Sequence, residues 1–206
     1  MSWSRFALVS LGLGLAAMTL APQNAAAIVV TDDVILGGIE PSSLALNAEQ
    51  SDTEIKLFSE KLDHILAADL TLNVGSSPIL AGTRVSSYMF HFDALSGNNR
   101  NAMGSAMFDN DVLGVIHTTD LLNASDSELG LATTWYTASL RGLEIGSDAF
   151  NIEGNMITVN VDFNVNHRYM DEMRVVTRSA IPEPGTALLL GLGLVGAGLI
   201  RRKRHA

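Results

Sequence analysis

The residue types that most often carry enzymatic chemistry occur in this sequence without the spacing that would bring them together. The chain has 206 residues and no cysteine, which excludes a cysteine nucleophile, a thiolate zinc site and a disulfide scaffold. No serine lies in the Gly-x-Ser-x-Gly elbow of hydrolases, and no His-Glu-x-x-His motif occurs. The histidines His64, His91, His117 and His167 are widely separated. We therefore predict no catalytic residue and a protein that is not an enzyme.

One acidic stretch has part of the pattern of a calcium loop. Asp109, Asp111 and Asp120 fall at positions 1, 3 and 12 of an EF-hand loop. Position 5 is Leu113, which offers no oxygen, and a strand pattern follows where the motif needs a helix, so we exclude an EF-hand. We predict no metal site and no cofactor. A calcium site in a loop of another kind is the alternative, with oxygen donors from Asp93, Asn98, Asn99, Asn101, Asp109 and Asp111.

A ladder of amides and carboxylates is the best candidate for a ligand surface. From Met156 to Asn166, apolar residues alternate with polar ones, as in a strand with one buried and one solvent-facing side. The polar positions include Asn160, Asp162, Asn164 and Asn166. Such side chains pair with sugar hydroxyls, and Trp135 could stack on the apolar face of a sugar ring. We favour ordinary solvent-facing polarity for this side of the strand and keep the ligand face as the alternative.

Alternating hydrophobicity dominates the chain between residues 28 and 180, and Gly, Asn, Asp and Ser separate the apolar runs. Gly154-Asn155 suits the tight turn of a hairpin. Short strands at this spacing predict an all-β domain, namely an antiparallel β-sandwich of the jelly-roll kind. The expected strands are residues 70–74, 84–93, 112–116, 140–145, 156–166 and 172–177.

Residues 51–68 fit two structures. Apolar residues at spacings of three and four would share one face of a helix, and Ser51 with Glu54 would form a capping box at its start. The same segment also contains two strand-like runs, 55–58 and 62–66. The periodicity alone favours the helix, but we favour the strands because of a resemblance described below.

The first 27 residues have the pattern of a secretory signal peptide. Arg5 precedes a largely apolar run of fifteen residues from Phe6 to Leu20, which is short of the roughly 20 residues that span a bilayer. Ala25 and Ala27 are small residues at the positions that signal peptidase reads. We predict cleavage after Ala27 and export across the inner membrane.

A second apolar segment lies near the end of the chain. No charged residue interrupts it between Gly185 and Ile200. It is followed by the basic residues Arg201, Arg202, Lys203 and Arg204. Because such positive flanks stay cytoplasmic, we predict a transmembrane helix over about residues 184–200 and a cytoplasmic tail over 201–206. The domain before it would then lie outside the inner membrane.

Residues 181–206 resemble the PEP-CTERM protein-sorting signal. The resemblance is carried by Pro182-Glu183-Pro184, the short Gly/Leu-rich segment and the Arg-rich end, in that order. It implies an exosortase-type sorting enzyme as a partner, cleavage near the two prolines, and delivery to the cell surface or extracellular matrix of a Gram-negative bacterium. The physical pattern alone indicates an outward-facing, membrane-tethered domain.

The domain of residues 28–180 resembles a β-sandwich ectodomain of PEP-CTERM proteins that has no assigned activity. The blocks that carry this resemblance are residues 51–68, 81–85, 90–93, 112–116 and 141–144. The resemblance implies a β-hairpin over residues 51–68 that leads into the strand at Leu70.

The charge of this domain excludes a nucleic-acid partner. The whole chain has 22 acidic and 13 basic residues, of which Glu183 and five basic residues lie in the two ends, so the domain keeps 21 acidic and 8 basic residues. Phosphate contacts need clustered Lys and Arg.

We therefore predict an exported surface or extracellular-matrix protein with a non-enzymatic, structural or adhesive role linked to exopolysaccharide. The expected partners are signal peptidase, the exosortase-type enzyme, the inner membrane in transit, and exopolysaccharide. A carbohydrate-binding β-sandwich module is the first alternative. An extracellular hydrolase with a dispersed site is the second, because catalytic triads are defined by geometry and not by sequence position.

Replacing Pro182, Glu183 and Pro184 by alanine should block processing, because it removes the rigid, proline-flanked acid that the sorting enzyme is expected to recognise. The variant should accumulate as an uncleaved, membrane-bound precursor on immunoblots of membrane, surface and medium fractions. Alanine at Ile181 and Thr186, which flank the motif, is the matched control. Unchanged surface release of the triple variant would refute this prediction.

Overall fold

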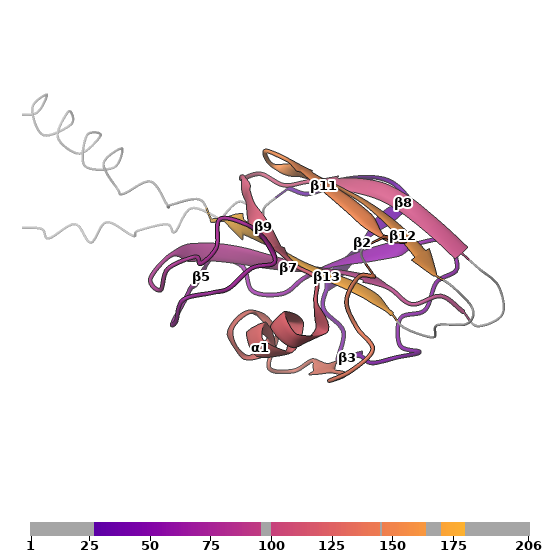
Figure 1. Ribbon diagram of the computed structural model, residues 1–206, viewed down its shortest axis with the longest axis horizontal. Helices are drawn as coiled ribbons and strands as arrows, with labels where there is room; N and C mark the ends of the chain where they lie inside the picture. The colour runs from indigo at the N-terminus through magenta and orange to yellow at the C-terminus, as the bar shows by residue number, and fades with distance from the viewer. Residues whose placement is uncertain (1–26, 96–99, 145, 164–169, 180–206) are drawn as a thin grey trace, which may run out of the picture.

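The computed structural model describes residues 27–95, 100–144, 146–163 and 170–179 (Figure 1). They form a domain built mainly of β-strands, as the alternating pattern predicts, together with one helix. The sorting signal, the predicted transmembrane segment and the predicted signal peptide up to residue 26 lie outside the described residues. No helix within the described residues is long and apolar enough to cross a membrane.

The strands form two large sheets and one small one. The first sheet has seven strands: β2 (Val34–Ile39), β4 (Ile55–Ser59), β7 (Arg84–Phe92), β13 (Asp171–Arg178), β9 (Val112–Ile116) and β6 (Val74–Gly75) in spatial order, with β5 (His64–Ile65) also paired to β7. The second has four strands: β1 (Val29–Asp32), β8 (Arg100–Met107), β12 (Met156–Phe163) and β11 (Ala149–Glu153). β3 (Ser43–Leu44) and β10 (Trp135–Tyr136) form a separate parallel pair, and the helix is α1 (Thr119–Leu129).

The seven-stranded sheet is the middle of three layers (Figure 1). One face packs against the four-stranded sheet through a core that includes Phe90 of β7 and Ile157 of β12. The other face packs against α1 and neighbouring loops, in a second core that joins Met89 to Leu122 and Leu129. The two sheets of the predicted sandwich are thus present, with a third layer that the sequence analysis did not predict.

The strand order differs from the predicted jelly roll, whose eight strands form two Greek keys. Here the sheets have seven and four strands, and β2 runs parallel to β4. The parallel pair arises because the chain passes from one sheet to the other between β1 and β2, next to Asp32, whose φ of 56° permits a sharp change of direction. Residues 40–54 then return along the sheet before β4 begins.

β7 and β13 lie at the centre of the seven-stranded sheet and are buried on both faces. Successive side chains of a strand point to opposite faces. Met173 and Val175 face the core between the sheets, so Glu172 and Arg174 point toward α1. This alternation places charged side chains of β13 under the helix.

The sequence analysis did not predict helix α1. Its apolar face is narrow, with Leu122 and Leu129 fully buried, and most of its other residues are polar. Asp120 in the first turn suits the positive end of the helix dipole, and the N–H of Gly130 donates to the Asp126 carbonyl at the C-terminus at 2.9 Å. Packing on the sheet therefore stabilises this helix more than the intrinsic helix propensity of its residues does.

Residues 51–68 contain strands, as predicted, but the predicted hairpin is wrong. β4 and β5 pair with successive parts of β7 and not with each other. The N–H of Glu54 donates to Ser51 Oγ at 3.0 Å, which is the hydrogen bond of a capping box. Here the bond closes a turn before β4, so a hydrogen bond typical of the start of a helix occurs where no helix follows.

The other strand predictions have mixed outcomes. The hairpin at Gly154 joins β11 to β12 as predicted. The strand predicted at residues 140–145 is wrong, because Leu140 with φ 61° and Gly142 with φ 111° interrupt the extended backbone. The strand predicted at residues 70–74 is wrong, because only an isolated bridge at Leu70 and the short strand β6 occur there. β1, β2, β3, β8, β10 and β11 were not predicted.

Both ends of the described domain are hydrogen-bonded to the same turn, at residues 109–111. The N–H of Ala27 donates to Asp109 Oδ2 at 2.6 Å, and the N–H of Arg178 donates to the Asp111 carbonyl at 2.9 Å. Asp171, at the start of β13, lies at the opposite end of the sandwich, because eight residues of strand extend about 25 Å.

Candidate functional site

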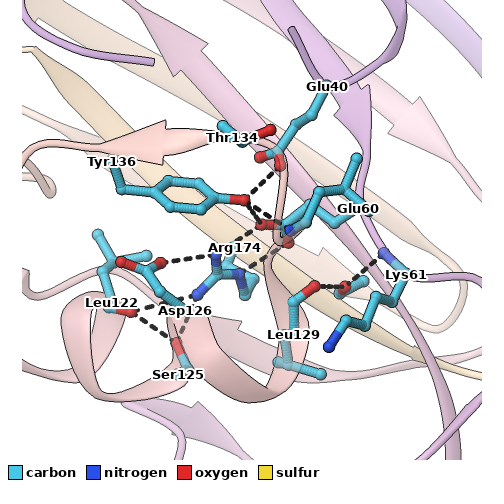
Figure 2. A network of polar contacts seen from close by, with 12 residues as sticks. Glu40, Glu60, Lys61, Leu122, Ser125, Asp126, Leu129, Thr134, Tyr136 and Arg174 are labelled. Atoms are coloured by element: carbon cyan, nitrogen blue, oxygen red, sulfur yellow. Dashed lines mark hydrogen bonds and ion pairs between the residues drawn. The ribbon is translucent and has the colours of Figure 1, made fainter. Parts of the chain in front are cut away.

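Polar side chains gather in two places. Between the seven-stranded sheet and α1 lies a set that we call the arginine network, part of which Figure 2 shows. The arginine network consists of Glu40, Glu60, His91, Ser125, Asp126, Tyr136, Arg141, Glu172 and Arg174. At the end of the sandwich opposite the Asp109–Asp111 turn lies the acid cluster, which consists of Glu144, Asp148 and Asp171.

Arg174 is the centre of the arginine network. Its side chain is fully buried, and each of its five N–H donors has an acceptor. Nε and Nη2 hold the two oxygens of Glu60 at 2.7 and 2.5 Å, and Nη2 also donates to Asp126 Oδ1 at 2.9 Å. Nη1 donates to Ser125 Oγ at 2.5 Å and to the Leu122 carbonyl at 3.3 Å. One side chain of β13 thus joins the end of β4 to α1.

Tyr136 extends the network to the segment after β2. Its Oη contacts Glu40 Oε2, lies 3.4 Å from Glu60 Oε1, and accepts the N–H of Leu131 at 3.0 Å. Burial, together with repulsion from Glu60, raises the pKa of Glu40 to about 8. A protonated Glu40 can donate to Tyr136 Oη, which leaves the phenol proton free for Glu60.

Arg141 and Glu172 form a second buried ion pair. Arg141 Nε donates to Glu172 Oε2 at 2.5 Å, and Nη1 donates to Asp126 Oδ2 at 2.7 Å, so Asp126 bridges the two arginines. Glu172 Oε1 lies 3.0 Å from His91 Nδ1, and His91 Nε2 lies 3.1 Å from the Ala48 carbonyl. Both neighbours of the imidazole are hydrogen-bond acceptors.

The charges of the network compensate one another. Burial opposes the charge of Arg174, but Glu60 and Asp126 outweigh this effect and hold its pKa above the ordinary value. Burial likewise acts to raise the pKa of Glu172, but the hydrogen bond with His91 and the charge of Arg141 hold it below its ordinary value. The side chains of both arginines and of their glutamates are 0% exposed. The network therefore fixes α1 on the sheet and presents none of these groups to solvent.

The negative charges of the acid cluster are less well balanced than those of the arginine network. One carboxylate oxygen from each of Glu144, Asp148 and Asp171 lies within 4.8 Å of the other two. Asp148 Oδ1 accepts the N–H of Asp162 at 2.9 Å, and Oδ2 accepts the N–H of Glu144 at 2.7 Å. Asp171 is 4% exposed, and its Oδ2 has no hydrogen-bond partner among the described residues.

Burial and mutual repulsion keep protons on this cluster. Burial, together with the charges of Asp148, Glu144 and Asp162, raises the pKa of Asp171 to about 9. Burial also raises the pKa values of Asp148 and Glu144. At neutral pH the cluster therefore retains at least one proton.

The structure describes part of the candidate ligand face, and it places Trp135 away from that part. Asn160 and Asp162 lie on β12, and Asn164 and Asn166 lie outside the described residues. Trp135 is 65% exposed, but it belongs to β10, next to α1 in the third layer (Figure 1). The seven-stranded sheet separates Trp135 from β12. Asn160 Oδ1 already accepts the Asn101 amide at 2.8 Å.

The predicted oxygen donors for calcium are not assembled either. Asp93 accepts the N–H of Asn47, Asp109 accepts that of Ala27, and Asn101 donates to Asn160, while the positions at 98 and 99 lie outside the described residues. The acid cluster shares no member with this predicted set. The region from Asp109 to Asp120 is a turn, β9 and the start of α1, which agrees with the exclusion of an EF-hand.

The residues of both clusters escaped the sequence analysis for a physical reason. Glu172 and Arg174 alternate with apolar residues, which is the pattern of a solvent-facing strand side, and the helix that covers them lies about 50 residues away along the chain. Glu144, Asp148 and Asp171 come from separate segments. The one signal available in the sequence was the presence of charged residues, Glu172 and Arg174, within the strand predicted at residues 172–177.

One comparison with known proteins gives a match. The family model of the PEP-CTERM protein-sorting motif matches residues 180–204, which covers Pro182, Glu183 and Pro184 and the basic residues Arg201, Arg202, Lys203 and Arg204 and confirms the resemblance seen in the sequence. No curated protein and no solved structure matches the chain.

Arg174→Met should destabilise the domain by about 3–5 kcal/mol, because it leaves Glu60 and Asp126 buried without their guanidinium partner. Urea unfolding followed by circular dichroism measures the loss. The matched control is Arg84→Met, which breaks an ion pair with Asp63 whose side chains are 35% and 34% exposed and should cost about 0.2–1 kcal/mol. Equal losses for the two variants would contradict a central role for Arg174.

Glu40→Gln should flatten the pH dependence of stability. The folded state keeps the Glu40 proton up to about pH 8, whereas the unfolded chain loses it near the ordinary value of 4.5. The wild type therefore loses stability as pH rises from about 4.5 to 8, by roughly 1 kcal/mol per pH unit relative to Glu40→Gln. Urea unfolding between pH 5 and 8 measures the slopes, with the exposed Glu153→Gln as control. Parallel slopes for wild type and Glu40→Gln would disprove the assignment.

Proposed function

We propose, from the premise that this chain is a PEP-CTERM protein, that its folded domain is a non-enzymatic structural or adhesive component of the cell surface or extracellular matrix, linked to exopolysaccharide. The sorting motif implies export, a membrane-anchored precursor and processing by an exosortase-type enzyme. The role of the domain itself is the proposed part.

The observation that carries this proposal is the burial of the groups best suited to chemistry. The pair of His91 with Glu172 has the composition of a general acid–base pair, but the side chains of both residues are 0% exposed. Arg141, Arg174 and Glu60 are equally enclosed. A substrate cannot reach these groups without displacing α1, so their arrangement suits a rigid, inert domain.

The position of the two ends supports a tethered module. Ala27 and Arg178 both bond the turn at residues 109–111, so the connections to the signal peptide and to the sorting motif leave from the same end. The opposite end, with the acid cluster, then points away from the membrane. A domain held in this way presents its far end to the surrounding matrix.

The alternatives draw less support. A carbohydrate-binding face on β12 is less well supported because Asn160 and Thr158 bond Asn101 and Ser105 within the sheet at 2.8 and 2.9 Å. Trp135 lies in another layer, where it cannot stack on a sugar bound to β12. In the case of a hydrolase, His91, which contacts Glu172 of the buried pair with Arg141, is enclosed. The partly exposed pair of His64 and Glu128 joins β5 to the end of α1 at 2.7 Å.

Mixing the processed protein with exopolysaccharide isolated from the producing strain tests this role. A structural or adhesive component should sediment with the polysaccharide in saturable, stoichiometric amounts and release no reducing ends. Trp135→Ala and Asp162→Ala should sediment like wild type, because neither side chain forms part of a glycan pocket in this proposal.

Two results would count against the proposal. Release of reducing ends by catalytic amounts of protein would indicate a hydrolase. Loss of sedimentation in Trp135→Ala or Asp162→Ala alone would indicate a specific carbohydrate-binding module.

A further inference from the structure

We propose that the acid cluster of Glu144, Asp148 and Asp171 is a binding site for a divalent cation of the size of calcium, at the end of the domain that faces away from the membrane. This site has no residue in common with the arginine network. It stands independently of the proposed matrix role.

The spacing of the three carboxylates fits one ion. Calcium binds oxygens at about 2.3–2.6 Å, so two ligand oxygens on opposite sides of the ion lie about 4.6–5.2 Å apart. The three oxygens of the cluster lie within 4.8 Å of one another. Magnesium needs near-octahedral geometry at about 2.0–2.1 Å and keeps several of its waters, so a site of three protein carboxylates suits calcium better. The all-oxygen ligand set also favours a hard cation over zinc.

A buried oxygen without a partner points to a missing ligand. Asp171 Oδ2 is buried and accepts no hydrogen bond from the described residues. A buried carboxylate oxygen in this state is costly unless it is paired, protonated or bound to a metal. Glu144 and Asp148 lie within reach of one cation that would satisfy Asp171.

Asp148 and Asp171 are held in place for binding. Both oxygens of Asp148 accept backbone N–H groups, at 2.9 Å from Asp162 and at 2.7 Å from Glu144. A carboxylate oxygen has more than one lone pair, so these bonds orient Asp148 and leave it able to bind an ion. Asp171 is fixed by its pairing with Phe92 in the sheet. Such second contacts commonly orient metal ligands.

The exposure of Glu144 gives an ion a way in. Asp148 and Asp171 are 3% and 4% exposed, whereas Glu144 is exposed. Three carboxylates leave several calcium positions to water or backbone carbonyls, which suits the affinity of extracellular calcium modules, about 0.1–1 mM. A bound ion would join the segment before β11, in the four-stranded sheet, to β13 in the other sheet.

Calcium titration of the full-length chain, purified in a nonionic detergent and stripped with EDTA, tests the site. Calorimetric titration with calcium should give a dissociation constant of about 0.1–1 mM. At ten times that concentration the melting temperature should rise by roughly 3–6 °C, and the same concentration of magnesium should raise it less. Asp171→Asn should abolish the calcium-dependent shift.

Asp171→Asn should itself stay folded, because it removes a buried carboxyl from between two others. Glu144→Gln changes an exposed residue and should weaken calcium binding at least tenfold, so it tests the site even if Asp171→Asn does not fold. Glu153→Gln, an exposed glutamate at the far end of β11, should bind like wild type. The proposal is overturned by the absence of a calcium-dependent shift in the wild type, by an undiminished shift in Glu144→Gln, or by an equal response to magnesium.

Discussion

The contact between Arg174 and Glu60 is the constraint on which the three-layer arrangement depends. Two parallel hydrogen bonds at 2.7 and 2.5 Å fix the guanidinium in its plane, and its remaining donors are then aimed at α1. The helix has a narrow apolar face, so the directional bonds to Asp126 and Ser125 define where it lies on the sheet. Because buried ion pairs contribute little net stability compared with apolar packing, the network specifies the position of α1 more than it strengthens the fold.

The domain uses the same residue types in two opposite ways. In the arginine network each buried carboxylate faces a guanidinium, an imidazole or a hydroxyl, and the charges are internal. In the acid cluster, carboxylates face one another and one oxygen of Asp171 has no partner among the described residues. The first arrangement balances its charges internally, and only Glu40 Oε1 and Arg141 Nη2 of its buried polar atoms have no hydrogen-bond partner among the described residues. The second is complete only with a proton or a cation, and it lies at the end of the domain where exchange with the surroundings is possible.

The parts of the fold that could be predicted are those with a local signal. Alternation identified β7, β9, β12 and β13, and the turn at Gly154 identified the hairpin. Helix α1 was missed because two leucines facing the core leave almost no periodicity. Glu54 and Ser51 gave a helix signal that a turn uses equally well. The two clusters depend on contacts between distant segments, such as Arg174 with Glu60, which no local pattern encodes.

The place of β13 in the chain has a consequence for biogenesis. It is the last strand before the sorting motif, yet it lies inside the seven-stranded sheet between β7 and β9. A chain threaded through the membrane from its N-terminus therefore cannot close its sheet until almost the whole domain has crossed. Completion of the seven-stranded sheet thus needs the residues that directly precede the sorting motif.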